Sequence, residues 1–228
     1  MCGKAIVTLN IGNRKEALFS EPFFHRYCAR YGLDFVVINE KRFKLNPNRW
    51  KPRLGIHFEK FQLLELFDDY DRIAYLDSDI LIHPKAPDIF EQVDEATIGC
   101  VFEDVGKDAW KREEEWDKVQ ALLGKLPEVH RYFNSGVMVL SKWHKRLFDL
   151  NLGIPSGRWL DQTFLNYHSR KLNLPVKEIS PQFNFLPVFP GWHDSKVRLS
   201  QYFVHYAGRK NKSIMRTDAL LFREAWGF

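Results

Sequence analysis

The chain has 228 residues, of which 45% are hydrophobic, 28% charged and 15% aromatic. This length and composition allow one domain with a full core and exclude a low-complexity chain. The formal net charge of +5 favours an enzyme that binds anionic substrates, and it also suits weak contact with nucleic acid or peripheral contact with a membrane surface.

The three cysteines, Cys2, Cys28 and Cys100, have neither paired nor metal-like spacing, so we expect reduced thiols. No secretory leader precedes the first apolar stretch, and no apolar run reaches transmembrane length. We therefore expect a cytoplasmic protein without a membrane anchor in this chain.

The first 53 residues predict the start of a parallel α/β sheet. Residues 4–10 are typical of a buried strand, and residues 14–31 have helical periodicity, in which Pro22 marks a kink or the true start of the helix. A second strand is predicted at 33–39, and the order strand, helix, strand favours a parallel pair. Residues 41–53 are basic and aperiodic, which indicates either a solvated loop or a basic lip over an anionic substrate.

The rest of the chain continues the alternation of helices and strands. Periodicity predicts helices at 54–67, 87–93, 108–123 and 159–171, and strands at 73–76, 96–102 and 202–206. Residues 131–140 indicate a polar turn that leads into a strand. Because no internal repeat, low-complexity tract or linker interrupts the pattern, we expect a single domain over residues 1–228.

The most informative motif is Asp77-Ser78-Asp79, which follows directly on the predicted strand at 73–76. Ligands of open α/β sheets bind at the carboxyl ends of the strands, and two carboxylates there suit Mg²⁺ or Mn²⁺. Such a metal would carry a diphosphate, so the motif favours a protein that handles a nucleotide sugar. A chance match is the alternative, because Asp69-Tyr70-Asp71 has the same spacing in a polar turn.

Two further features suit the same chemistry. His205 ends the predicted strand at 202–206, where it is either a third metal ligand or a hydrogen-bonded structural histidine. Gly208 is followed by cations that would neutralise a phosphate or would simply form a basic surface loop; these are Arg209, Lys210 and Lys212.

Two polar groups suit the sugar. Asn134-Ser135-Gly136 is either a turn before a strand or a source of amide and hydroxyl groups for sugar hydroxyls. Asp161-Gln162 is either a helix N-cap or a carboxylate and amide pair for the same sugar.

The order of these motifs resembles the retaining glycosyltransferases of the glycogenin and bacterial lipooligosaccharide galactosyltransferase group, family 8. The resemblance covers residues 5–212, and its motifs are Ile6-Val7-Thr8-Leu9, Phe58-Glu59-Lys60, Leu76-Asp77-Ser78-Asp79, Phe133-Asn134-Ser135-Gly136-Val137, Leu160-Asp161-Gln162 and His205-Tyr206-Ala207-Gly208. It implies an α/β chain with the GT-A fold, a Rossmann-like domain whose mixed central sheet is flanked by helices.

The resemblance also implies the residues of the site. Mn²⁺ or Mg²⁺ would be held by Asp77, Asp79 and His205. The UDP-sugar donor would lie against Thr8, Leu9, Asn10, Lys60, Asp77, Ser78, Asn134, Ser135, Gly208, Lys210 and Lys212, and the catalytic residues would be Asp161 and Gln162. The family's phosphate-binding lysine falls on Asn211 here, between Lys210 and Lys212, so either neighbour could replace it.

The predicted function is therefore transfer of a hexose from a UDP-sugar to a carbohydrate or glycoconjugate acceptor. One alternative is a sugar-nucleotide nucleotidyltransferase, but the segment after the first strand is too poor in glycine for it. The other is a non-catalytic sugar- or nucleic-acid-binding module, which would not explain the paired aspartates. We expect no nucleic-acid partner. For the acceptor, the sequence suggests a wall of carboxylates and aromatic rings made by Glu103, Asp104, Trp110, Trp192 and His193. The alternative is a surface loop with a partly buried tryptophan.

Overall fold

The computed structural model describes residues 3–12, 14–43, 55–106, 109–126, 131–152 and 159–227. Most of the predicted basic lip at 41–53 lies outside these ranges, as does Cys2. Cys28 and Cys100 are free thiols buried in the interior. None of the helices within the described ranges combines the length and apolar character that a membrane span requires.

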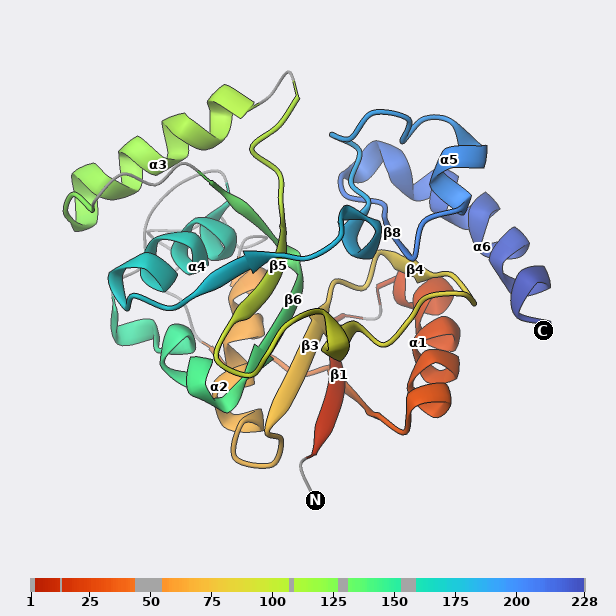
Figure 1. Cartoon of the computed structure of the whole chain (residues 1–228), viewed down its shortest axis with the longest axis horizontal. Coiled ribbons are helices and arrows are strands. Elements are labelled where there is room, and N and C mark those ends of the chain that lie inside the picture. Colours follow the sequence, from red (N-terminus) through yellow and green to blue (C-terminus); the bar gives the residue numbers. More distant parts are fainter. Residues whose placement is uncertain are drawn as a thin grey trace.

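A six-stranded mixed sheet forms the centre of the molecule, as predicted (Figure 1). Its strand order is β2 (Asp34–Ile38), β1 (Lys4–Leu9), β3 (Arg72–Leu76), β6 (Phe133–Ser141), β5 (Ile98–Phe102) and β7 (Val176–Glu178). Strand β1 is parallel to both of its neighbours, and β6 runs antiparallel to β3 and β5. The carboxyl ends of β1, β3 and β5 therefore meet at one edge of the sheet.

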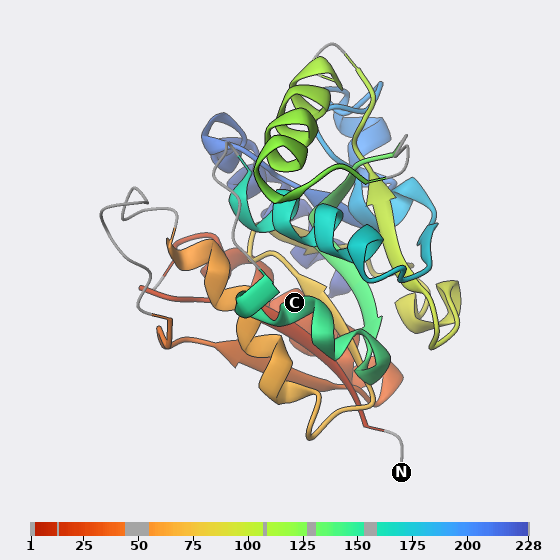
Figure 2. The same cartoon turned by 90° about the vertical axis from the view of Figure 1, so that its left-hand side faces the viewer.

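Helices cover the two faces of the sheet (Figures 1 and 2). On one side lie α1 (Ala17–Tyr31), α6 (Lys212–Trp226) and the short α5 (Ser195–Leu199). On the other side lie a 3₁₀-helix (Gly55–Gln62), α2 (Leu63–Leu66) and α4 (Leu160–Lys171). Helix α3 (Ala109–Leu123) packs on α4. In β3, Ala74 and Leu76 face the first side, whereas Ile73 and Tyr75 face the second. Burial on both faces explains why the strands are continuous apolar runs in the sequence.

A second, two-stranded sheet brings the C-terminal part of the chain to the motif at Asp77–Asp79. It pairs β4 (Ile80–Ile82) with β8 (Phe203–His205) antiparallel, and Ile80 lies opposite His205. The Tyr206 backbone N–H donates to the Asp79 carbonyl at 2.9 Å and extends this ladder. Backbone pairing therefore fixes His205 beside Asp79.

The structure corrects three local expectations. Pro22 lies inside α1, which begins at Ala17, so it does not mark the start of the helix. The predicted helix at 54–67 is mostly 3₁₀, with only Leu63–Leu66 in α conformation. Asn134-Ser135-Gly136 is part of β6 rather than a turn before it, because a register irregularity opposite Cys100 and Val101 accommodates these residues within the strand.

Candidate active site

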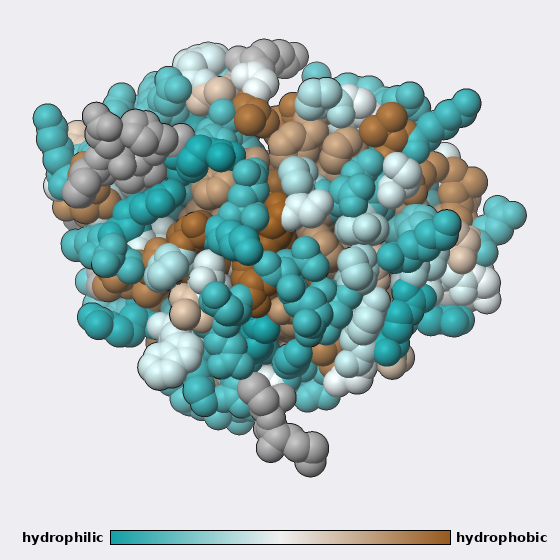
Figure 3. Space-filling model, in the orientation of Figure 1, coloured by the Kyte–Doolittle hydropathy of each residue, from teal (hydrophilic) through white to brown (hydrophobic). Residues whose placement is uncertain are grey.

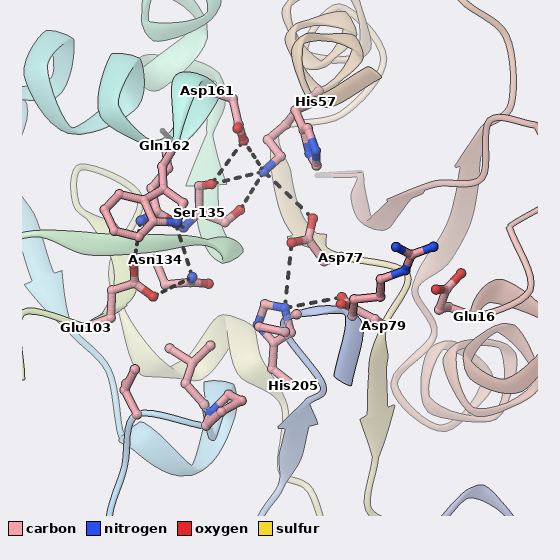
Figure 4. A pocket seen from close by; sticks show the side chains of 18 of the residues that line it. Glu16, His57, Asp77, Asp79, Glu103, Asn134, Ser135, Asp161, Gln162 and His205 are labelled. Atoms are coloured by element: carbon pink, nitrogen blue, oxygen red, sulfur yellow. Dashed lines mark hydrogen bonds and ion pairs between the residues drawn. The ribbon is translucent and has the colours of Figure 1, made fainter. Parts of the chain in front are cut away.

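A cavity of about 580 Å³ opens at the carboxyl ends of β1, β3 and β5. It lies where open α/β sheets bind their ligands. The predicted site residues that line it come from several helices, strands and loops and are Lys60, Asp77, Asp79, Asn134, Ser135, Asp161, Gln162, His205, Gly208 and Lys212. Figure 4 labels seven of them, Asp77, Asp79, Asn134, Ser135, Asp161, Gln162 and His205, and shows their side chains converging on the cavity.

The two aspartates and the histidine form a compact ligand cluster. Ligand atoms of Asp77, Asp79 and His205 lie within 4.8 Å of one another. The imidazole Nε2 lies 3.2 Å from Asp79 Oδ1 and 3.8 Å from Asp77 Oδ2. Two carboxylates and one imidazole suit a divalent cation such as Mn²⁺.

A hydrogen-bond chain sets the tautomer of His205. The Asn184 amide donates to Asn134 Oδ1 at 3.0 Å, so its own oxygen is left to accept from His205 Nδ1 at 2.8 Å. With Nδ1 engaged by Asn184, Nε2 faces the two aspartates and is the nitrogen available to a metal ion. Such a second partner on the far nitrogen is the usual way in which proteins orient a metal-binding histidine.

Gly136 leaves the space that this cluster occupies. A Cβ atom at Gly136 would lie 2.3 Å from the His205 ring and 2.8 Å from both Asp77 Oδ2 and Asn134 Oδ1. Its carbonyl also accepts from the Asp77 backbone N–H at 2.8 Å. The glycine is thus required by close packing around the carboxylates and the imidazole.

Lys212 contacts the cluster at Asp79. Its ammonium group pairs with Asp79 and donates to the Tyr206 carbonyl at 3.1 Å. Burial alone would raise the pKa of Asp79, but the His205 and Lys212 charges outweigh it and hold that pKa below its usual range. Lys210 does not line the cavity, whereas Gly208, at φ 90°, lines it in a conformation that favours glycine.

Lys60 joins the sheet to the first turn of α4 through a buried ion pair. Only 2% of Lys60 is exposed, and its Nζ donates to Asp161 Oδ2 at 2.8 Å, to the Ser135 carbonyl at 3.0 Å and to Ser135 Oγ at 3.1 Å. Burial alone would raise the pKa of Asp161, but the charges of Lys60 and His57, together with hydrogen bonds from Lys60 and Ser135, hold that pKa below its usual range. Asp161 is not the N-cap, a position held by Trp159, so its carboxylate is available to this pair.

The Gln162 amide is held in one orientation. Its Oε1 accepts from Asn134 Nδ2 and from the Ser135 N–H, each at 3.1 Å, and its Nε2 donates to Glu103 Oε1 at 2.7 Å. Asn134 also donates to the other Glu103 oxygen at 2.9 Å. The side chains of Glu103, Asn134 and Gln162 therefore form one buried network on the cavity wall (Figure 4).

Comparison with known proteins identifies the family of this chain. The model of the family described as "Glycosyl transferase family 8" matches residues 20–213. The chain belongs to glycosyl transferase family 8. No curated protein matches the chain in sequence.

Solved structures confirm the GT-A glycosyltransferase fold. A glycosyltransferase involved in glycosylation of the major capsid of PBCV-1 superposes with a TM-score of 0.63 at 15% identity, covering 94% of this chain and 99% of that one. The galactosyltransferase LgtC, in complex with donor and acceptor sugar analogues, superposes with a TM-score of 0.63 at 17% identity, covering 98% and 95% of the two chains. The bifunctional glycosyltransferase WbbM covers 91% of this chain at 17% identity and a TM-score of 0.59, with 46% of its own chain covered.

Besides Lys210, four predicted donor residues of this family 8 chain do not line the cavity. Thr8 and Leu9 are buried, and Ser78 is buried with its carbonyl accepting from Ser20 Oγ at 2.8 Å. The Asn10 side chain donates to Glu21 at 2.7 Å and accepts from the Arg14 N–H at 2.9 Å, so its amide serves the local turn.

The residues suggested for the acceptor wall do not come together. Trp192 is fully buried, donates to the Phe185 carbonyl at 3.1 Å and packs edge-on against Tyr206, so it is a core residue. Trp110 is 55% exposed on α3, while Glu103 lines the main cavity. Trp192 was suggested as an aromatic ring for a sugar, but large apolar side chains are commonly buried, and this one lies in the core.

The sequence analysis missed several residues that line the cavity, namely Arg14, Glu16, His57, Arg112, Trp159 and Leu186. Two of them stand close to predicted site residues: His57 precedes Lys60 by three positions, and Trp159 precedes Asp161 by two. Adjacency to a known motif could have drawn attention to these two. Arg112 carries no such signal, because tertiary packing alone brings α3 to the cavity.

Proposed function

We propose that this family 8 glycosyltransferase transfers a hexose from a UDP-sugar to a hydroxyl group of a carbohydrate or glycoconjugate, with a divalent cation and with retention of the anomeric configuration. The observation that carries the proposal is the cluster of Asp77, Asp79 and His205 in the same cavity as the Gln162 network. One end of the cavity thus suits a metal diphosphate, and the other suits a sugar.

The diphosphate end combines the metal-ligand cluster with two cations and a glycine turn. Mn²⁺ or Mg²⁺, held by Asp77, Asp79 and His205, would supply charge neutralisation for the departing UDP. Lys212 is placed to exchange its pairing with Asp79 for a phosphate oxygen, and Gly208 allows the close approach of backbone to phosphate. Arg209 lines the same end of the cavity and adds a second cation.

The sugar end offers fixed hydrogen-bonding groups. Asp161, held by Lys60, and Asn134, held by Glu103, are oriented before a ligand arrives. Preorganised polar groups stabilise developing charge without reorganisation during the reaction. The Gln162 amide would lie beside an oxocarbenium-like transition state. Its oxygen already accepts two hydrogen bonds, which hold the amide in place.

We infer retention from the two described side chains proposed to lie beside the sugar, neither of which is a free base. Gln162 cannot take a proton, and Asp161 is paired with Lys60, which lowers the pKa of this carboxyl. We therefore assign deprotonation of the acceptor hydroxyl to an oxygen of the leaving phosphate. The acceptor oxygen then forms its bond to the anomeric carbon on the face from which UDP departs.

The test is release of UDP from a panel of UDP-glucose, UDP-galactose and UDP-rhamnose in the presence of Mn²⁺. We expect release with at least one donor, loss of it on addition of a chelator, and loss of it in Asp77→Asn. The matched control is Asp69→Asn, which changes an exposed aspartate of the same Asp-x-Asp spacing outside the cavity. Absence of release with every donor, or release that a chelator does not affect, would overturn the proposal.

A further inference from the structure

A second cavity, of about 340 Å³, lies between α3 and the segments that leave β5 and enter β6. Its lining includes Asp104, Arg112, Glu113, Trp116 and Asp117. The donor proposal uses none of these residues. In Figure 1, α3 lies on the opposite side of the molecule from α5 and α6, so this cavity is separate from the C-terminal segment that contacts the diphosphate end.

Arg112 forms part of the wall of both cavities. It is 6% exposed, its Nε donates to Glu103 Oε1 at 3.3 Å, and its guanidinium lies 4.6 Å from the centre of the Trp159 ring. Glu103 Oε1 also accepts from Gln162 Nε2 at 2.7 Å. The second cavity is therefore two hydrogen bonds away from the amide proposed to lie beside the transferred sugar.

The lining of the second cavity has the chemistry that binds a sugar. Glu113 and Asp117 are exposed carboxylates one helical turn apart on α3, and they can accept hydrogen bonds from hydroxyl groups. Trp116 lies between them, half-buried and packed against Tyr167 with ring centres 5.9 Å apart. A ring held in this way offers an apolar surface for the C–H groups of a pyranose.

The charges in the floor of the cavity favour a neutral ligand. Asp104 accepts from Arg131 Nε at 2.9 Å and from the Tyr132 N–H at 3.2 Å, and Arg112 is paired with Glu103. A charged ligand would have to compete with these pairs. A polyol can donate to the exposed carboxylates while it leaves the pairs intact.

We propose that the second cavity binds a neutral sugar residue of the acceptor, next to the residue that receives the transferred hexose. The enzyme would then prefer an acceptor of at least two sugar residues over a monosaccharide. This inference rests on the proposed function for its place in the reaction, but its binding step can be tested without any donor.

The binding test uses saturation-transfer NMR with a panel of neutral disaccharides that contain glucose, galactose or mannose. We expect the wild type to bind at least one of them, and Trp116→Ala to weaken that binding by about tenfold. Trp110→Ala is the matched control, because Trp110 is on the same helix but does not line the cavity. The double variant Glu113→Gln, Asp117→Asn changes only exposed groups and should also weaken binding.

The transfer test separates this inference from the proposed function. With a donor that the wild type accepts, Trp116→Ala should lower kcat/KM for the disaccharide and spare both the monosaccharide and hydrolysis of the donor. No disaccharide binding by the wild type, or unchanged binding in both Trp116→Ala and the double variant, would overturn the inference even if UDP is released. Disaccharide binding without UDP release from any donor would instead contradict the proposed function.

Discussion

Two walls of the main cavity are built differently. The sheet wall consists of Lys60, Glu103, Asn134, Asp161 and Gln162, each no more than 8% exposed and hydrogen-bonded to another member or to Ser135. The C-terminal wall consists of Asp79, His205, Gly208 and Lys212, and the side chains of Lys212 and Asp79 are 24% and 16% exposed. The charged groups of the sheet wall are therefore the more deeply buried.

The two walls should therefore respond differently to substitution. Members of the sheet wall satisfy one another, so removal of one leaves buried partners unpaired and costs stability as well as activity. Charges of the C-terminal wall face the cavity and can exchange partners when a ligand binds. Substitutions in the C-terminal wall should therefore affect ligand binding far more than folding. Figure 3 shows hydrophilic side chains over much of one face of the molecule, with hydrophobic side chains between them.

The largest effect on activity is expected from Asp77→Asn. The side chain is 34% exposed, and the amide can still accept from the Tyr75 hydroxyl, which now donates to Asp77 Oδ1 at 2.7 Å. Loss of a charged metal ligand should cost about 4 kcal/mol or more of transition-state stabilisation, roughly 1000-fold in kcat/KM. UDP release and thermal unfolding are measured on the same preparation. The variant should lose UDP release while its unfolding temperature stays close to that of the wild type.

Asp161→Asn should reduce stability and activity together. It removes the carboxylate that pairs with the buried Lys60 ammonium at 2.8 Å and leaves Asp77, at 3.8 Å, as the carboxylate paired with it. Breaking such a buried pair typically costs about 3–5 kcal/mol. Denaturant unfolding of variant and wild type measures the cost. A stability equal to that of the wild type would show that the pair is not part of a preorganised wall.

The same variant has a defined pH dependence. In the wild type the pKa of Asp161 is lowered, so the contribution of this carboxylate is present above its unfolded pKa of 3.8 and is lost as the pH falls through the folded pKa. The pKa of Lys60 is raised above 10.5, so its contribution is lost only as the pH rises beyond that value. The stability difference between wild type and Asp161→Asn should be constant from about pH 5 to 9 and shrink below about pH 4.

Lys212→Met should weaken donor binding and spare folding. A charge-assisted hydrogen bond to a phosphate is worth about 1.5–3 kcal/mol, which corresponds to roughly 10–100-fold in Kd. Lys210→Met is the matched control, because Lys210 is exposed and outside the cavity lining. Equal effects of the two substitutions on UDP affinity would mean that the basic segment acts through its general charge only.

Gly136→Ala tests the contact between the two walls. The added methyl would lie 2.3 Å from the His205 ring, so the strand or the ring must shift, at a cost of about 1–3 kcal/mol in unfolding free energy. Metal affinity should fall with it, because His205 Nε2 moves relative to the aspartates. Calorimetric titration with Mn²⁺ in the absence of UDP measures this, and unchanged affinity would contradict the proposed crowding.

Much of the fold could be predicted because buried strands and helices have recognisable hydrophobic patterns in the sequence. The apolar runs at 4–10 and 73–76 have almost the bounds of β1 and β3, and the paired aspartates follow directly on β3. Side-chain networks leave no such pattern: Lys60 and Asp161 are 101 positions apart, and Gln162 reaches Glu103 over 59 positions. Trp192 was placed in the acceptor wall because its sequence neighbourhood does not distinguish a ligand-binding ring from a core ring.

The central claim is that Asp77, Asp79 and His205 hold a metal that binds the UDP diphosphate. Calorimetric titration of UDP into the protein, with Mn²⁺ and then with a chelator, tests it without knowledge of the sugar or the acceptor. We predict that the wild type binds UDP only when Mn²⁺ is present, and that Asp77→Asn fails to bind it under either condition. Equal affinity for UDP with and without Mn²⁺, or wild-type affinity in Asp77→Asn, would contradict the account.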